Sequence, residues 1–283
     1  MRSSFGRAAS SALAVAATLA VPVMIACKRE PAAPPAPNAV VITATNYAFA
    51  MPDTIPSGVT RLRLVNNGSE MHHAAMVRLT NGATMDSLSR FLSSPPGPPP
   101  AWLEWVGSPN VPPPGDTMDV YTDLTPGLYA AICVIPDSAG RPHFALGMVK
   151  ALHVVAATGP AAVEPAADNV ARLTDYAFAF DSTVTAGRKL IRVNNEGREP
   201  HEIIFARLDS GATAQALVTW IRAGMRGRPP ATPAGGVVAV QAGSHTTMQL
   251  NLTPGTYGVY CFLPAPDGKE HVDHGMISTI TVN

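Results

Sequence analysis

The sequence predicts an all-β protein made of two tandem β-sandwiches, each interrupted by one short helix. The first observation behind this class is an internal repeat: Asn46–Met51 (NYAFAM) returns as Asp175–Phe180 (DYAFAF), about 128 positions later. The second is a series of short alternating or β-branched runs that are bounded by clusters of Gly, Pro, Asn and Ser. A repeat this long indicates duplicated domains, because the units of a solenoid are only about 20–50 residues long.

Residues 1–26 have the features of a bacterial lipoprotein signal peptide. Two arginines supply positive charge, and residues 12–25 form an apolar run that is too short to span a membrane comfortably. The run ends in MIAC at residues 24–27, which resembles a lipobox, the motif whose cysteine is acylated and becomes the mature N-terminus. We therefore expect Cys27 to carry the lipid. A plain signal peptide that is cut near Ala26 is the alternative.

The repeat also predicts how the mature chain is divided. Residues 27–38 are rich in Pro and Ala, and we expect them to form a semi-rigid tether between the lipid and the folded body. The predicted boundaries are 39–156 for the first domain, 157–168 for a linker and 169–283 for the second domain. The linker is predicted because it contains Pro, Ala and Gly and has no hydrophobic periodicity.

The composition gives no support to a nucleic-acid partner. The chain has 20 Lys and Arg against 20 Asp and Glu, and no block of like charge interrupts it. Nucleic-acid binding needs a basic patch or stripe. After the signal peptide, no apolar run is long enough to cross a bilayer.

Local patterns predict the elements within each copy. Strands are expected at residues 40–44, 61–65, 129–133 and 257–261. One helix is expected in each copy, with Thr84 capping residues 85–92 and Thr213 capping residues 214–223. The last two strands end in a cysteine and therefore lead into a possible site.

A duplicated set of metal-ligand residues is the strongest functional signal. The first set is His72, Cys133, His143 and Met148, and the second is His201, Cys261, His271 and Met276. In both sets the cysteine ends the motif LxPGxYxxxC, nine residues separate Cys from His, and four separate His from Met. Two His, one Cys and a weak axial Met are the ligands of a blue-copper site. We therefore expect at most one copper ion in each domain.

Other assignments of these residues remain open. His73 is an alternative to His72, and His274 is an alternative to His271, although the alignment of the two copies favours the first of each pair. A disulfide between Cys133 and Cys261 is another alternative, but equivalent interior positions of separate domains are expected to be too far apart to be bridged. A copy that keeps the fold without the metal is a further alternative.

Both copies resemble cupredoxins, the domain of plastocyanin, pseudoazurin and the copper nitrite reductases. Residues 200–205 (PHEIIF) are similar to the plastocyanin segment that carries the upstream His ligand, and the spacing between His and Met matches too. The gap between Cys and His is longer than in small electron carriers and closer to that of the nitrite reductase blue-copper domain. The residue after the upstream His, usually an Asn that ties the ligand loops together, is His73 in one copy and Glu202 in the other.

The resemblance implies cupredoxin-like Greek-key sandwiches with type 1 copper. It implies that Cys133 and Cys261 bind as thiolates, that the histidines of the two sets are equatorial ligands, and that Met148 and Met276 are axial. It also implies an exposed ligand histidine, at which electrons leave toward a partner protein.

The predicted function is electron transfer by a copper protein that is lipid-anchored in the cell envelope, facing the periplasm or the extracellular medium. Its partners would be an unidentified redox protein and, through the N-terminal lipid, a membrane. Copper storage or delivery and a metal-free interaction module are the alternatives. A copper enzyme of the nitrite reductase or two-domain oxidase type is disfavoured, because no His adjoins either Cys and no His-x-His pair supplies a second copper site.

Overall fold

The computed structural model describes residues 1, 6, 35–95 and 97–283. The predicted lipid-bearing Cys27, nearly all of the predicted signal peptide and most of the tether lie outside these residues. The described residues from 35 onward belong to one compact unit. None of the helices in the described ranges has the length and apolar character needed to cross a membrane.

The described elements fall into two halves that follow the repeat. The first half contains β1 (Asn38–Thr45), β2 (Ala48–Ala50), β3 (Thr54–Pro56), β4 (Gly58–Asn66), β5 (Ala75–Leu79), α1 (Met85–Leu92), β6 (Leu103–Asn110), β7 (Thr117–Leu124), β8 (Gly127–Ile132), the 3-10 turn η1 (His143–Leu146) and β9 (Val149–Val155). The second half contains β10 (Asn169–Thr174), β11 (Ala177–Phe180), β12 (Gly187–Asn195), β13 (His201–Leu208), α2 (Ala214–Arg222), β14 (Ala231–Val240), β15 (His245–Leu252), β16 (Gly255–Tyr260), the 3-10 turn η2 (His271–His274) and β17 (Ile277–Val282).

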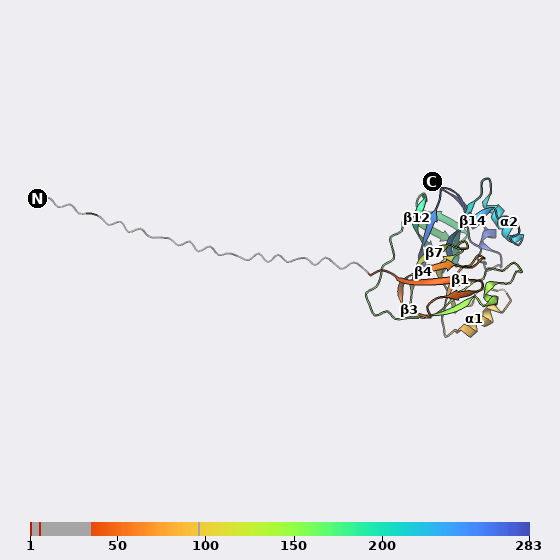
Figure 1. Ribbon diagram of the computed structural model, residues 1–283, viewed down its shortest axis with the longest axis horizontal. Helices are drawn as coiled ribbons and strands as arrows, with labels where there is room; N and C mark the ends of the chain where they lie inside the picture. Colours follow the sequence, from red (N-terminus) through yellow and green to blue (C-terminus); the bar gives the residue numbers. More distant parts are fainter. Residues whose placement is uncertain (2–5, 7–34, 96) are drawn as a thin grey trace. The chain divides into compact units, whose positions relative to one another are not determined.

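The strands form two sheets, and each sheet contains strands of both halves (Figure 1). The first sheet has the order β11-β10-β12-β15-β7-β4-β1-β2, and the second has the order β17-β16-β13-β14-β6-β5-β8-β9-β3. Within each half the two sheets enclose a shared apolar core, so that each half is a β-sandwich. The all-β fold class predicted from the sequence is confirmed.

The halves join where β7 pairs with β15 and β6 pairs with β14, a junction called the seam below. In the first sheet Val120 lies opposite Met248, and in the second sheet Pro109 lies opposite Val237. Each pair joins two positions that are equivalent in the repeat. Because a position can lie opposite its own equivalent only on a symmetry axis, the halves are related by an approximate two-fold axis through the seam.

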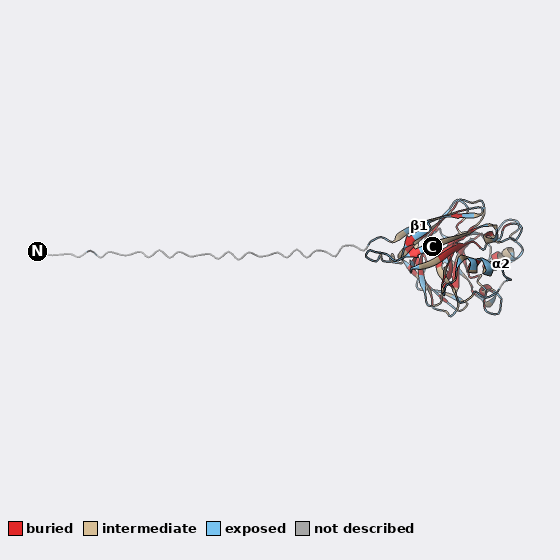
Figure 2. Cartoon of the chain, turned by 90° about the horizontal axis from the view of Figure 1, so that it is seen from below, coloured by how far each residue is buried: buried red, intermediate tan, exposed pale blue. Residues whose placement is uncertain are grey.

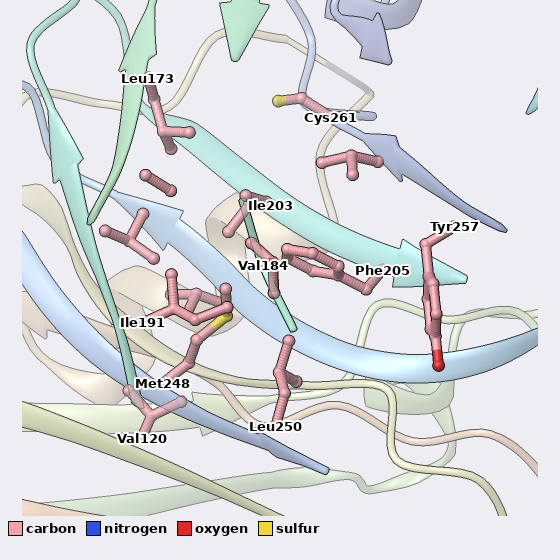
Figure 3. Close-up of a cluster of buried hydrophobic side chains, with 14 of the residues drawn as sticks. Val120, Leu173, Val184, Ile191, Ile203, Phe205, Met248, Leu250, Tyr257 and Cys261 are labelled. Carbon is pink, nitrogen blue, oxygen red and sulfur yellow. The ribbon is translucent and has the colours of Figure 1, made fainter. Parts of the chain in front are cut away.

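Alternating side chains build the core of each sandwich. In β4, Leu62 and Leu64 are fully buried, whereas Arg61 and Arg63 are only partly buried on the other face. Figure 2 shows that the buried residues are concentrated in the strands. Figure 3 shows the core of the second half. Val120, which belongs to the first half, lies in the same cluster of buried side chains as Met248. Burying a large apolar side chain of this kind stabilises the fold by about 1.5–3 kcal/mol.

The predicted helix in each half is confirmed. α1 spans Met85–Leu92, and the Thr84 hydroxyl accepts a hydrogen bond from the backbone N–H of Ser87. α2 spans Ala214–Arg222 and is capped in the same way by Thr213. Both helices pack on the second sheet, through Leu88 in the first half and Leu217 in the second.

The predicted domain boundaries remain predictions. β9 ends at Val155 and β10 begins at Asn169, and the residues between them form neither helix nor strand. The two halves nevertheless share both sheets, so the hydrogen bonding between strands continues from one half to the other.

Candidate metal centres

Each half places its cysteine and second histidine on the loop that follows one strand of the second sheet. Cys133 is the first residue after β8, and Cys261 is the first residue after β16. His143 begins η1, and His271 begins η2. Both cysteines are free thiols, so the disulfide between them is excluded.

The upstream histidine comes from the neighbouring strand. His72 lies just before β5, which pairs with β8 so that Ala75 lies opposite Ile132. His72 therefore reaches the end of β8, where Cys133 begins the loop. In the second half His201 is the first residue of β13, which pairs in the same way with β16.

Backbone hydrogen bonds close the loop onto the methionine. The backbone N–H of Cys133 donates to the carbonyl oxygen of Met148 at 3.1 Å, and that of Met148 donates to His143 at 3.0 Å. The same two bonds recur in the second half, and Met148 and Met276 are both fully buried. The methionines thus lie beside the cysteine and histidine of each loop, while their role as axial ligands remains a prediction.

In the first half the ligand atoms of His72, Cys133 and His143 all lie within 4.8 Å of one another. Nδ1 of His72 is 3.1 Å from Nδ1 of His143, and Sγ of Cys133 is 3.5 Å from the same Nδ1. All three residues are fully buried. The structure therefore brings together the three predicted strong ligands of the first centre.

The second half repeats this geometry with His201, Cys261 and His271. The two Nδ1 atoms are 3.0 Å apart, and Sγ of Cys261 is 3.3 Å from Nδ1 of His271. These residues are also fully buried. The two centres are thus equivalent in both residue type and the atoms that converge.

The outer nitrogens of the four histidines are held by oxygen atoms. In the first half, Nε2 of His72 lies 2.9 Å from Asn46 Oδ1, and Nε2 of His143 lies 3.0 Å from Glu70 Oε2. In the second half, Nε2 of His201 lies 3.2 Å from Asp175 Oδ1, and Nε2 of His271 lies 3.0 Å from Glu199 Oε2. An ionised carboxylate and an amide oxygen can only accept hydrogen bonds. Each of these Nε2 atoms therefore carries a proton, and a ring in its neutral form presents a lone pair at Nδ1.

With this protonation pattern each centre could hold a cation. Two Nδ1 lone pairs face each other at about 3 Å, a distance at which acceptors without a proton between them repel. A metal ion between the two nitrogens and the sulfur removes the repulsion and uses all three donors. Two imidazoles, one thiolate and a nearby thioether are compatible with a type 1 copper site.

Burial favours the neutral forms of Cys133, Cys261 and His72 in the absence of metal. It raises the pKa of Cys133 to about 11, raises that of Cys261 further, and lowers the pKa of His72 to about 4. A bound cation reverses the effect on sulfur, because it stabilises the thiolate. Metal binding is therefore expected to release a proton from each cysteine.

A Tyr–Glu pair covers each centre. The Tyr47 hydroxyl donates to Glu70 Oε1 at 2.8 Å, and its ring centroid lies 4.7 Å from that of His143. Tyr176 donates to Glu199 Oε1 at 3.2 Å over the second centre. The expectation of an exposed ligand histidine is wrong, because both second histidines are buried beneath these pairs.

The residue after each upstream histidine ties the centre to its cysteine loop. The backbone N–H of Val134 donates to Nε2 of His73 at 3.0 Å, and that of Phe262 donates to Glu202 Oε1 at 2.8 Å. Burial lowers the pKa of His73 to about 4 and raises that of Glu202 to about 7. These residues therefore make the loop contact that the resemblance assigns to an Asn.

A glycine fits against each upstream histidine. A Cβ on Gly197 would lie 2.6 Å from Nε2 of His201 and 2.5 Å from Oδ1 of Asp175, and Gly68 lies in the same way against His72 and Asn46. Neither position can accept a side chain without displacing the ligand ring or its hydrogen-bond partner.

These supporting residues were not predicted from the sequence, although the repeat contained a signal for them. Tyr47 and Glu70 recur as Tyr176 and Glu199, in step with the ligand histidines. A polar residue that recurs in both copies beside a ligand is a candidate for orienting that ligand.

The other histidines lie outside the two trios. Nε2 of His274 lies 3.1 Å from Asp267 Oδ1, and its ring stacks on Tyr176 with centroids 4.6 Å apart. His153 and His245 are exposed. The geometry thus favours His271 over His274 and His72 over His73, as the alignment of the copies does.

Comparison with known proteins finds distant structural likenesses. No family model matches the sequence, and no curated protein matches it. Reduced auracyanin from Roseiflexus castenholzii is 23% identical, over 40% of this chain and 94% of that one, with a TM-score of 0.29. A multicopper oxidase is 14% identical, over 87% of this chain and 88% of that one, with a TM-score of 0.26. The copper nitrite reductase from Nitrosomonas europaea is also 14% identical, over 87% of this chain and 93% of that one, with a TM-score of 0.25.

The likeness to these neighbours is too distant to transfer an activity, so what this chain binds must follow from its own residues.

Proposed function

We propose that each half binds one copper ion as a type 1 centre and that the protein transfers electrons. The observation that carries this proposal is the convergence, in both halves, of two histidine Nδ1 atoms and one cysteine sulfur. Copper held there would gain and lose one electron by changing between Cu(II) and Cu(I). The buried methionine of each loop would be the weak axial ligand.

The chain's own contribution is to hold the ligands in place before the metal arrives. Each histidine is fixed by a hydrogen bond at Nε2, and each cysteine is fixed by the backbone bond to its methionine. Such outer contacts orient the rings and set the basicity of the donors. A site that is fixed in this way rearranges little when an electron enters or leaves.

Copper content and the visible spectrum test the proposal. The full chain, reconstituted with Cu(II), is expected to bind two copper ions and to show an intense thiolate-to-copper band. Copper-loaded protein without that band would contradict the type 1 assignment. The predicted absence of enzyme activity remains a prediction.

The Tyr–Glu pairs over both centres favour copper storage or delivery as a second candidate function. The ligand histidines are buried, so a partner protein has no direct access to them. Repeated cycles of oxidation and reduction, in the presence of a Cu(I) chelator, distinguish the two. An electron carrier keeps its copper through the cycles, whereas a storage or delivery protein loses it to the chelator.

We also propose that the protein is anchored in the cell envelope through acylated Cys27. The lipobox-like sequence and the Pro/Ala-rich segment after it support this location. Mass spectrometry of the native N-terminal peptide is expected to find a lipid-modified Cys27 at the mature start. An unmodified Cys27, or a mature start at another residue, would refute the anchor without affecting the copper proposal.

A further inference from the structure

We propose that the protein binds one small aromatic amine, as an organic cation, in a cavity at the seam. This site is separate from the two candidate metal centres, and the proposal needs no copper in either of them. The cavity has a volume of about 1060 Å³, which is at the upper end of the range for small-molecule sites. Residues of both halves line it, so each chain offers one such site at the seam.

The cavity lies on the face of the second sheet on which the two helices pack. Trp105 of β6 and Ile204 of β13 line the cavity and belong to the same clusters of side chains as α1 and α2. The alternate residue of β13, Ile203, points into the core of the sandwich instead. At the seam, between the areas that the helices cover, the sheet carries the small side chain of Ala75 beside Val238. This small side chain leaves room for a ligand.

Aromatic rings from equivalent positions of the two helices form the walls. Phe91 of α1 and Trp220 of α2 each lie seven residues after the capping threonine, and both line the cavity. Nε1 of Trp220 donates to the backbone carbonyl of Arg226 at 3.0 Å, so the polar atom of this ring already has a partner. Trp105 adds a third ring from the sheet. The faces of such rings attract both an aromatic ligand and a cation.

The polar end of the cavity holds a buried carboxyl group without a cationic partner. Glu202 lines the cavity and is 6% exposed. Its Oε1 accepts the N–H of Phe262 at 2.8 Å, and its Oε2 accepts Nδ2 of Asn110 at 3.2 Å. Within the described part of the chain, no Lys, Arg or His side chain forms an ion pair with these oxygens. A buried carboxylate is normally paired, and about two of its roughly four lone-pair sites remain for a ligand.

A second acceptor lies next to this carboxyl group. Oδ1 of Asn110 is buried and has no hydrogen-bond partner among the described residues. Asn110 lines the cavity, and its Nδ2 is the atom that binds Glu202. A carboxylate and an amide oxygen can only accept hydrogen bonds, whereas an ammonium group only donates them. An ammonium group therefore complements both residues.

The other charged groups in the lining do not oppose a cation. Two ion pairs balance their own charge, Asp137–Arg141 at 2.8 Å and Glu270–Arg222 at 3.2 Å. Nε2 of His73 accepts a backbone N–H, so this ring carries only one proton and is neutral. Arg226 is exposed, so water screens its charge. Glu202 is therefore the charge that selects the ligand.

Three ligands with the same ring test the role of charge: 2-(1-naphthyl)ethylamine, 2-(1-naphthyl)ethanol and 1-naphthylacetate. Isothermal titration measures their binding to the full chain without copper, because an amine can also bind the metal. The pH is set below the pKa of the amine and above that of Glu202, which burial raises to about 7. We expect the amine to saturate one site per chain and to bind about 10-fold or more tightly than the alcohol. The acetate is expected not to bind.

Two variants of buried carboxyl groups locate the site. Glu202→Gln is expected to weaken binding of the amine by about 10-fold and to leave binding of the alcohol unchanged. Asp137→Asn is the matched control, because Asp137 is equally buried in the same lining but is already paired with Arg141. It is expected to bind the amine as the wild type does. Trp220→Leu removes a wall and is expected to weaken binding of the amine and the alcohol alike.

A readout on the wild-type chain keeps the test valid if Glu202→Gln does not fold. The N–H of Phe262 donates to Glu202, so its amide NMR signal is expected to shift with the amine and to shift less with the alcohol. Equal affinity for amine and alcohol, equal losses in Glu202→Gln and Asp137→Asn, undiminished binding in Trp220→Leu, or an unshifted Phe262 signal would overturn the proposal. None of these results bears on the copper centres, which their own visible spectrum tests.

Discussion

Cys261→Ser is expected to remove the blue band of the second centre completely and to leave that of the first. The band arises from charge transfer between the thiolate and copper, and a serine hydroxyl cannot supply it. Sγ of Cys261 is one of the three atoms that converge on the metal position, with Nδ1 of His271 at 3.3 Å. Visible absorption of the copper-loaded full chain measures the loss.

Two other variants control this result. Cys133→Ser removes the equivalent sulfur of the first half, so it should remove the other part of the band, and the double variant should be colourless. Met276→Leu keeps the thiolate and should keep the colour, with a raised potential, because an axial thioether is a weak ligand. Full colour in Cys261→Ser would mean that the second half holds no type 1 copper.

Gly236→Ala is expected to destabilise the whole molecule, by on the order of 3 kcal/mol or more. Gly236 lies in β14 at the seam, and a Cβ there would overlap the carbonyl oxygen of Ile203 in the neighbouring strand. The backbone of β13 cannot move away without breaking its ladder with β14. The midpoint of denaturant unfolding measures the loss.

Gly159→Ala is the matched control for this change. No atom lies within 4 Å of a Cβ at Gly159, so its effect on the free energy of unfolding should stay within about 0.5 kcal/mol. Equal midpoints for the two variants would show that β13 and β14 are less closely packed than the structure indicates.

Much of the fold could be predicted because local signals and the repeat agree. Thr84 and Thr213 mark the helix starts through capping, a contact that depends only on residues within one turn. The seam could not be predicted, because it depends on which strand edges meet. β14 (ATPAGGVVAV) contains Pro233, Gly235 and Gly236, residue types that are usually unfavourable within a paired strand.

The ligand trios could be predicted for a different reason. Cys133 or His143 alone has ordinary explanations, but the same order and spacing in a second copy makes chance improbable. The residues that surround the ligands were harder to predict from the sequence. Glu70 and Tyr47 are of residue types that are common at surfaces, and only the fold shows that they hold and cover a ligand ring.

The seam has the symmetry of the interface between two identical subunits, in which a residue pair on one side of the axis recurs on the other side with the two partners exchanged. A true homodimer must carry the same residue on both sides of its axis. Fusion of the two copies into one polypeptide removes that constraint, so Asn110 can stand where its counterpart is Val238, and Glu202 where its counterpart is His73. Two metal sites related by exact symmetry would share one potential and give an electron no preferred direction. A covalently joined pair can differ on its two sides, and so it can have an input end and an output end.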